Sequence, residues 1–313
     1  LNEWLKTPDL EPYRRAIELI TRQRPYILSP AEERIIAQAG DFASGPKDIF
    51  TMLNNADITF PVIEDEDGEA VQLTHGNYIL FMESENREVR KRAFQALYET
   101  YGKQKNTLAA LMSANVKKDN FYAKVRRYPS ALEAALYNEE IPSRVYDSLI
   151  GCVTQHLPLF YRYLKLRKKV LGVDELHFYD VYAPLAKESN RTISYEEAVA
   201  MVKAGLAPLG EQYIADMTVG IEGGWIDVLE NEGKTSGAYS SGVYGTMPYV
   251  LLNHQDNLNS VFTLAHELGH SMHSFYSCKN QPYVYSGYRI FVAEVASTVN
   301  ETLLLRHLLQ NSK

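Results

Sequence analysis

Two histidines and a glutamate stand together in residues 261–270, which read VFTLAHELGH. His266 and His270 are four positions apart, so on an α-helix their side chains project from one face. Two neutral imidazoles at this spacing supply two of the four ligands of a tetrahedral Zn²⁺ site. Glu267, directly after the first histidine, is then placed to accept a proton from a water molecule at the metal. The spacing predicts a hydrolytic metal centre, although a surface helix could carry the same three residues without a metal.

The residues just before the motif are apolar, which indicates that this helix is buried. Histidine and glutamate side chains on a buried helix cost free energy unless they are paired or bound to a metal. Burial therefore favours the metal centre over the surface helix. The apolar residues are Val261, Phe262, Leu264 and Ala265.

A third candidate ligand lies in a second apolar stretch with helical character. Residues 290–297 read IFVAEVAS, and Glu294 is the single carboxylate among them, 24 positions after His270. A catalytic zinc site takes three protein ligands and leaves the fourth position to water. His266, His270 and Glu294 would form such a set.

Four longer stretches, all between Phe178 and Glu301, add to this pattern. They are FYDVYAPL at 178–185, GKTSGAYSSGVYGTMPYVLLN at 233–253, HELGHSMHSFYS at 266–277 and QPYVYSGYRIFVAEVASTVNE at 281–301. With these stretches the sequence resembles the zinc oligopeptidases of the thimet oligopeptidase clan, peptidase family M3, and most closely the oligopeptidase F branch.

The resemblance implies a metalloendopeptidase that binds one Zn²⁺ per chain and hydrolyses short peptides inside a deep channel. Carried over by position, His266, His270 and Glu294 would be the metal ligands and Glu267 the catalytic general base. The family takes its oxyanion-stabilising residues from a later segment, which would lie beyond Lys313. Met247 stands where a histidine is expected in the closest relatives, so substrate specificity rather than chemistry would differ if this position touches the substrate.

We expect a mainly α protein, a large helical zinc-peptidase fold with a small β-ribbon near the active-site helix. Residues 1–85 are expected to form an N-terminal helical segment with a β-hairpin, whose acidic tip at 64–68 we interpret as a solvated turn. Residues 86–313 would form the zinc metallopeptidase catalytic region. The chain begins without Met, and members of the resembled family are nearly twice as long. We therefore expect an internal, C-terminally truncated piece that is weak or inactive alone.

Residues 225–253 are rich in glycine and carry short runs with β-propensity. A sheet edge binds an extended peptide by strand addition, and glycines let the two backbones approach closely. Gly237, Ala238 and Tyr239 are therefore candidates for substrate contact, unless the ribbon is purely structural. Further candidates are His273, three positions after His270, and Tyr283 and Tyr285, which lie between the two zinc-bearing helices.

The sequence does not identify which groups orient the two imidazoles. A metal-bound histidine usually donates its second N–H to a carboxylate or a carbonyl group. Four polar residues that follow Glu294 could serve: Ser297, Thr298, Asn300 and Glu301.

Composition narrows the class of protein. The 313 residues carry a net charge of −7, which argues against a nucleic-acid partner, and no apolar run is long enough to span a membrane. Cys152 and Cys278 are the two cysteines, too few for a disulfide framework, so we expect a cytoplasmic protein. Short peptides are the expected partners, and the sequence indicates no oligomeric state.

Two rival interpretations remain. Dipeptidyl carboxypeptidases related to angiotensin-converting enzyme use a similar motif, but they are largely secreted and disulfide-bonded, unlike a chain with two isolated cysteines. Alternatively, the protein could be a zinc-stabilised helical scaffold that binds peptides without cleaving them. Glu267 argues against the scaffold, because a structural zinc site has no use for a base at that position.

Overall fold

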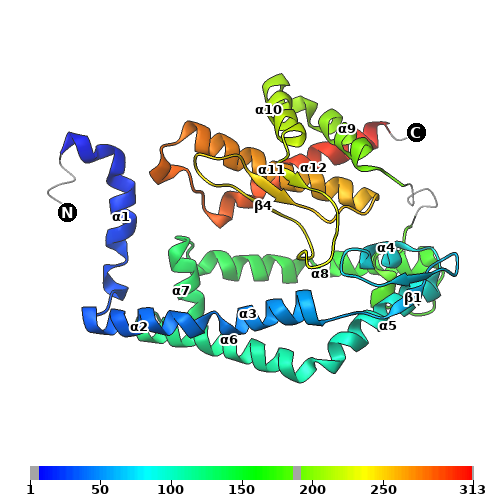
Figure 1. Ribbon diagram of the computed structural model, residues 1–313, viewed down its shortest axis with the longest axis horizontal. Coiled ribbons are helices and arrows are strands. Elements are labelled where there is room, and N and C mark those ends of the chain that lie inside the picture. The colour runs from blue at the N-terminus through cyan, green and yellow to red at the C-terminus, as the bar shows by residue number, and fades with distance from the viewer. Residues whose placement is uncertain (1–6, 186–191, 312–313) are drawn as a thin grey trace.

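The computed structural model describes residues 7–185 and 192–311, and it confirms the predicted mainly helical fold with small sheets. Figure 1 shows α2, α3, α6 and α8 along one side of the molecule and α9 to α12 along the other. Within the described residues, no helix is both long and apolar enough to cross a bilayer. The α-helices are α1 Arg14–Arg22, α2 Pro30–Ala43, α3 Gly45–Met52, α4 Tyr78–Glu83, α5 Arg87–Lys103, α6 Lys105–Val125, α7 Ala131–Asn138, α8 Ser143–Leu171, α9 Tyr195–Leu206, α10 Glu211–Glu222, α11 Leu258–Asn280 and α12 Ile290–Asn311.

Helix starts follow local sequence signals. Ser29 and Glu32 form a capping box at the start of α2, so each satisfies a backbone N–H that the helix leaves free. Ser194 caps α9 by accepting a hydrogen bond from the backbone N–H of Glu197. Short 3-10 turns occupy several connections, among them Phe178–Asp180 (η5) and Tyr283–Tyr285 (η7).

The two predicted β regions are both present. Strands β1 Val62–Glu64 and β2 Ala70–Gln72 pair antiparallel as the hairpin. In the glycine-rich region, three strands form a sheet in the order β3-β5-β4, with β3 parallel and β4 antiparallel to β5. These strands are β3 Ile226–Asp227, β4 Tyr239–Ser241 and β5 Tyr249–Leu251.

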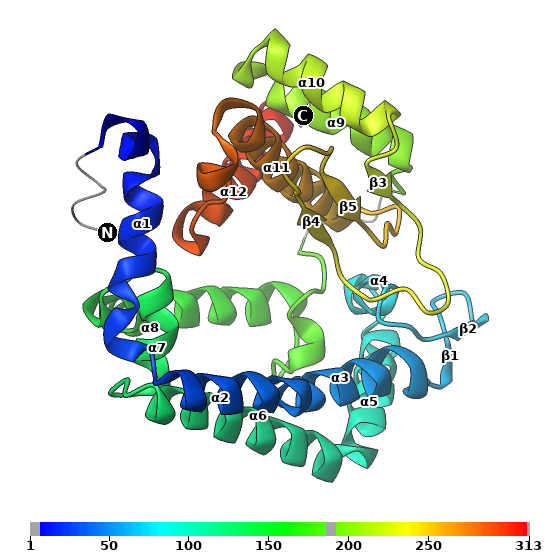
Figure 2. The same cartoon turned by 60° about the vertical axis from the view of Figure 1, so that its left-hand side comes forward.

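Two hydrophobic clusters support these parts. The larger one surrounds α11 and includes Leu264, Leu268 and Met272, together with side chains from α9, α10, α12 and the three-stranded sheet. Figure 2 shows α11 between α12 and the sheet, so the helix that carries the HExxH motif is the centre of this part of the fold. The smaller cluster joins the hairpin to α4 and α5, drawing on residues from both sides of position 85. The predicted domain boundary there stays a prediction.

A glycine sets the distance between the two helices that carry the candidate ligands. A Cβ atom added at Gly269 of α11 would lie 2.6 Å from the Cα atom of Ser297 and 2.8 Å from the carbonyl oxygen of Ala296, both on α12. These contacts are to backbone, so no side-chain rotation relieves them. The close crossing therefore requires glycine at this position.

We expect Gly269→Ala to lower the free energy of unfolding by roughly 1–3 kcal/mol, because α11 and α12 must separate to fit the methyl group. Thermal unfolding of the metal-free protein measures this loss. Gly151→Ala is the matched control, since Gly151 lies within α8 and a Cβ there meets nothing within 4 Å. That change should be neutral or stabilising by up to about 1 kcal/mol. Equal stability of the two variants would contradict the tight crossing.

Asp180 is fully buried and joins η5 to α5. Its carboxylate accepts hydrogen bonds from Arg87, Arg90 and the backbone N–H of His177. Burial by itself would raise the pKa of Asp180, but the hydrogen bonds from Arg87, His177 and Arg90 outweigh it and bring the pKa to about 2, from an ordinary value of 3.8. The stabilisation is therefore complete above pH about 4 and is lost as the pH falls towards 2.

Asp180→Asn should cost roughly 3 kcal/mol of unfolding free energy at neutral pH, because it leaves the buried Arg90 without its charge partner. Urea denaturation at pH 7 measures the loss. The difference in unfolding free energy between Asp180→Asn and the unsubstituted protein should become smaller between pH 4 and 2, because the wild-type carboxylate itself becomes protonated there. Glu64→Gln, which disturbs the exposed Arg92–Glu64 pair, should change little at any pH. A pH-independent cost for Asp180→Asn would refute the electrostatic explanation.

Candidate metal centre

The three predicted ligand atoms lie close together at the crossing of α11 and α12. The Nε2 atoms of His266 and His270 are 3.1 Å apart. Oε2 of Glu294 lies 3.2 Å from Nε2 of His266 and 3.3 Å from Nε2 of His270. Residues four apart on α11 supply two corners of this triangle, and the first turns of α12 supply the third. In the described part of the chain, no other group of at least three His, Cys, Asp or Glu residues has this proximity.

The triangle fits the face of a tetrahedral zinc site. Ligands about 2.0–2.1 Å from a zinc ion at tetrahedral angles are about 3.4 Å from one another. The three observed separations are close to that value and nearly equal. Two imidazole nitrogens and one carboxylate are also a donor set that zinc commonly takes. Both the geometry and the chemistry of these residues therefore suit Zn²⁺.

Glu301 answers which group orients the first histidine. Its Oε1 lies 2.5 Å from Nδ1 of His266, so a proton on Nδ1 leaves Nε2 with a free lone pair. The backbone of Ala293 on α12 lies beside the ring of His270. Burial lowers the pKa of His270, which favours the neutral imidazole that can bind a metal.

The other three candidates from the sequence have different contacts. Ser297 donates to Oε2 of Glu294 at 2.9 Å, so it orients the carboxylate rather than an imidazole. Asn300 donates to the carbonyl oxygen of Ala265 and ties α12 to α11. The hydroxyl of Thr298 donates to the carbonyl oxygen of Glu294 within its own helix.

Glu267 is a buried carboxylate beside the triangle. Only 6% of the residue is exposed, and its Oε2 finds no hydrogen-bond partner among residues 7–185 and 192–311. Burial raises the pKa of Glu267; the neighbouring His266 lowers it and Glu294 raises it further. A buried carboxylate oxygen without a partner is unusual in a protein interior, and here it is available to accept a proton from a bound molecule.

Strand β4 lies beside α11, the helix that carries the two histidines. The hydroxyl groups of Ser240 in β4 and Ser271 in α11 are 2.8 Å apart, and Ser271 directly follows His270. In the described chain β4 pairs with β5 on one side only, so it is an edge strand of the sheet. The sequence carries no signal for the Ser240–Ser271 contact, because a serine on a buried helix face has many possible partners.

The six candidate substrate contacts are distributed around this strand and helix. Gly237 precedes β4 with a φ of 86°, Ala238 packs against the larger cluster, and Tyr239 is 50% exposed. His273 stacks on Tyr288 with ring centroids 3.7 Å apart, and its Nδ1 has no partner in the part of the chain that is described. Tyr283 is exposed in η7 against the edge of Tyr244, and Tyr285 is half-buried in the same turn. Their role in substrate binding stays a prediction.

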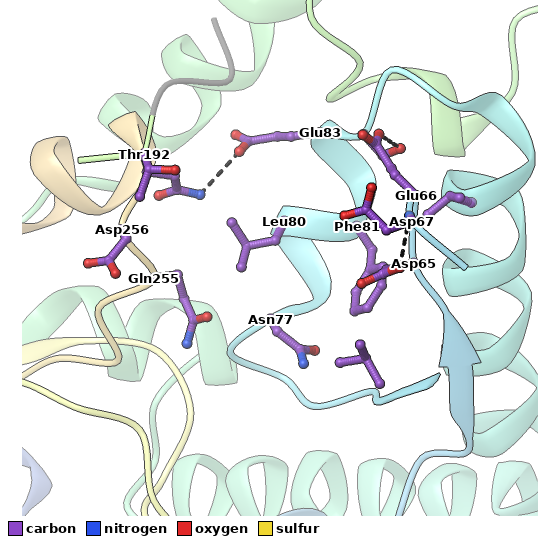
Figure 3. A pocket seen from close by; sticks show the side chains of 14 residues that line it. Asp65, Glu66, Asp67, Asn77, Leu80, Phe81, Glu83, Thr192, Gln255 and Asp256 are labelled. Carbon is purple, nitrogen blue, oxygen red and sulfur yellow. Dashed lines mark hydrogen bonds between the residues drawn. The ribbon is translucent and has the colours of Figure 1, made fainter. Parts of the chain in front are cut away.

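A separate acidic cavity lies at the hairpin (Figure 3). It has a volume of about 550 Å³ and lies between the hairpin and α4 on one side and the loop before α11 on the other. Asp65 accepts hydrogen bonds from the backbone N–H groups of Asp67 and Glu69, so it stabilises its own turn. Asn257 donates to Glu83 across the cavity at 3.1 Å. These contacts agree with a solvated turn.

Comparison with known proteins points to one family. The family model described as peptidase family M3 matches residues 80–313, and one described as oligopeptidase F matches residues 1–60. Oligopeptidase PepF of Bacillus subtilis (strain 168) is 56% identical over 307 residues, which are 98% of this chain and 46% of that protein. An oligoendopeptidase F homolog of Lactococcus lactis subsp. lactis (strain IL1403) is 46% identical over 100% of this chain and 52% of its own length. The chain thus spans about half the length of the curated relatives it matches.

Solved structures agree with these matches. A putative peptidase from Chlamydophila abortus has a TM-score of 0.76 and 40% identity, covering 100% of this chain and 52% of its own. Oligoendopeptidase-F from Enterococcus faecium has a TM-score of 0.68 and 38% identity, covering 99% of this chain and 49% of its own. The resemblance predicted from the sequence motifs is therefore confirmed.

Proposed function

The chain belongs to peptidase family M3, and from this membership and the geometry at α11 and α12 we propose that the protein is a zinc-dependent endopeptidase of short oligopeptides. His266, His270 and Glu294 would hold one Zn²⁺, and Glu267 would be the general base. The observation that carries the proposal is the near-equilateral triangle of donor atoms beside a buried carboxylate with an unpartnered oxygen.

A zinc ion held by these residues would polarise the scissile carbonyl group and lower the pKa of a water molecule to about 7. Glu267 accepts a proton from the attacking water at Oε2 and passes it to the nitrogen of the leaving amine. Its burial makes this carboxylate a better proton acceptor than an exposed one. Glu301, through Nδ1 of His266, and Ser297, through Oε2 of Glu294, fix the orientation of two of the three ligands.

We propose that the peptide lies extended along β4. The unpaired edge of Tyr239–Ser241 can donate to and accept from a peptide backbone, which selects an extended chain without selecting its sequence. Gly237 and Ala238 line the approach to this edge. His273, Tyr283 and Tyr285 are candidates for contacts with substrate side chains. The thiols of Cys152 and Cys278 are free, which suits the reducing environment of the cytoplasm.

Metal analysis together with cleavage of a quenched fluorescent peptide tests the proposed function. We expect one zinc per chain in protein purified at its native length, loss of cleavage on chelation, and recovery when zinc is restored. Zinc binding without any peptide cleavage would support the scaffold interpretation instead. Cleavage that survives complete removal of metal would overturn the proposal.

A further inference from the structure

The start of α12, the helix that carries Glu294, is held by a turn far away in sequence. Glu139 and Glu140 lie between α7 and α8, and Figure 1 shows this end of α7 next to the start of α12. Arg289, the residue just before α12, donates to the carbonyl oxygen of Asn138 at 2.6 Å and to Oε2 of Glu140 at 3.1 Å. The backbone N–H of Ile290 donates to Oε2 of Glu139 at 3.2 Å, over a separation of 151 positions.

These contacts act as a helix cap that is supplied by another part of the chain. The first backbone N–H groups of a helix have no partner within the helix, and a carboxylate at that end also interacts favourably with the helix dipole. The carboxylate of Glu139 provides both effects for α12 from another part of the chain. Glu140 adopts a φ of 59°, a left-handed conformation that is costly for a residue with a side chain.

The position of Glu294 depends on this end of the helix. α12 is packed tightly from Ser297 onward, where Gly269 and the Asn300–Ala265 hydrogen bond hold it against α11. None of residues 290–296 is buried, and the side chain of Glu294 is 58% exposed. Glu294 therefore lies between a firmly packed region and a helix end whose first N–H group and preceding arginine are held by residues 138–140.

We propose that residues 138–140 form a clamp that positions Glu294 for the metal, with Glu139 and Glu140 as positioning residues. The inference rests on the proposed function, because it takes Glu294 as a zinc ligand. Without the clamp the first turns of α12 fray, and the third donor atom is held less firmly near the two histidines. The clamp then contributes to zinc affinity without touching the metal.

Arg289→Ala tests the clamp, and Arg15→Ala is the matched control. Arg15 also pairs with Glu140, but from α1, so its loss weakens the same cluster without releasing α12. Two quantities are measured on protein of native length: zinc affinity by competition with a chelator, and amide hydrogen exchange in the metal-free state. For Arg289→Ala we expect roughly 10-fold weaker zinc binding and faster exchange at residues 290–296, with unchanged exchange in the middle of α11. Arg15→Ala should leave both quantities unchanged.

Glu139→Gln is a milder second variant in case Arg289→Ala does not fold. It keeps an acceptor for the N–H of Ile290 but removes the charge, so exchange at 290–296 should rise less than in Arg289→Ala. Wild-type zinc affinity in both variants would overturn the clamp, as would an equal loss of affinity in Arg15→Ala. Absence of zinc binding by the unsubstituted protein would overturn the proposed function, whereas exchange in the metal-free state would still decide whether the turn holds α12.

Discussion

Glu267→Gln should lower kcat for oligopeptide hydrolysis by about a thousandfold and leave the zinc content unchanged. Gln has nearly the shape of Glu, so it fits the buried position without disturbing the packing around α11. Its amide cannot accept the proton that the mechanism assigns to Oε2. Steady-state kinetics with a quenched fluorescent peptide, on protein whose zinc content has been measured, gives both quantities.

Glu64→Gln is the chemically matched control for this prediction, because it makes the same change on an exposed residue of the hairpin. It should leave kcat and KM unchanged. If Glu267→Gln hydrolysed peptides at the wild-type rate with zinc bound, Glu267 would not be the base. If neither the unsubstituted protein nor Glu267→Gln hydrolysed peptides while both bound zinc, the scaffold interpretation would gain support.

Glu294→Ala should weaken zinc binding far more than Glu301→Ala does. The first change removes one of three proposed ligands, whereas the second removes the carboxylate that holds Nδ1 of His266. Loss of a partner outside the ligand set costs roughly 10- to 100-fold in metal affinity, so the loss for Glu294→Ala should exceed that range. Chelator competition measures both dissociation constants on the same scale.

Glu294 and Glu301 lie seven positions apart on the same helix. Comparing the two variants therefore separates a residue that binds the metal directly from one that acts through a ligand. Equal losses would place Glu294 outside the ligand set. A larger loss for Glu301→Ala would indicate that Glu301 itself binds the metal.

Local patterns account for what could be predicted from the sequence. Residues four apart lie on one face of any α-helix, so predicting the helix was enough to predict that His266 and His270 lie close together. The strands of the three-stranded sheet were predictable because glycines bracket short apolar runs there. Glu294 was a candidate as the one carboxylate in a second apolar stretch, and the resemblance to family M3 gave it the role of a ligand.

Contacts between distant elements could not be predicted in the same way. Glu301 faces His266 only because α12 crosses α11 at Gly269, and a sequence does not state a crossing angle. The hydrogen bonds of Asp180 could not be predicted either, because its partners Arg87 and Arg90 lie about ninety positions earlier in the sequence. The clamp at residues 138–140 has no motif at all, because any turn with acidic side chains could serve.

The long helix α8 shows that an apolar pattern predicts a helix but not its packing partners. Its apolar residues predict a helix, which the structure contains from Ser143 to Leu171. Periodicity does not identify what a helix packs against. Several large side chains of α8, including Leu149, Val153 and Phe160, are exposed in the described chain.

Anomalous diffraction at the zinc absorption edge, from crystals of zinc-loaded protein, would locate the metal directly. We expect a single strong peak bonded to Nε2 of His266, Nε2 of His270 and a carboxylate oxygen of Glu294, each at about 2.0–2.2 Å, with a water molecule in the fourth position. A zinc peak elsewhere, or a zinc ion at the two histidines with Glu294 turned away, would contradict this expectation.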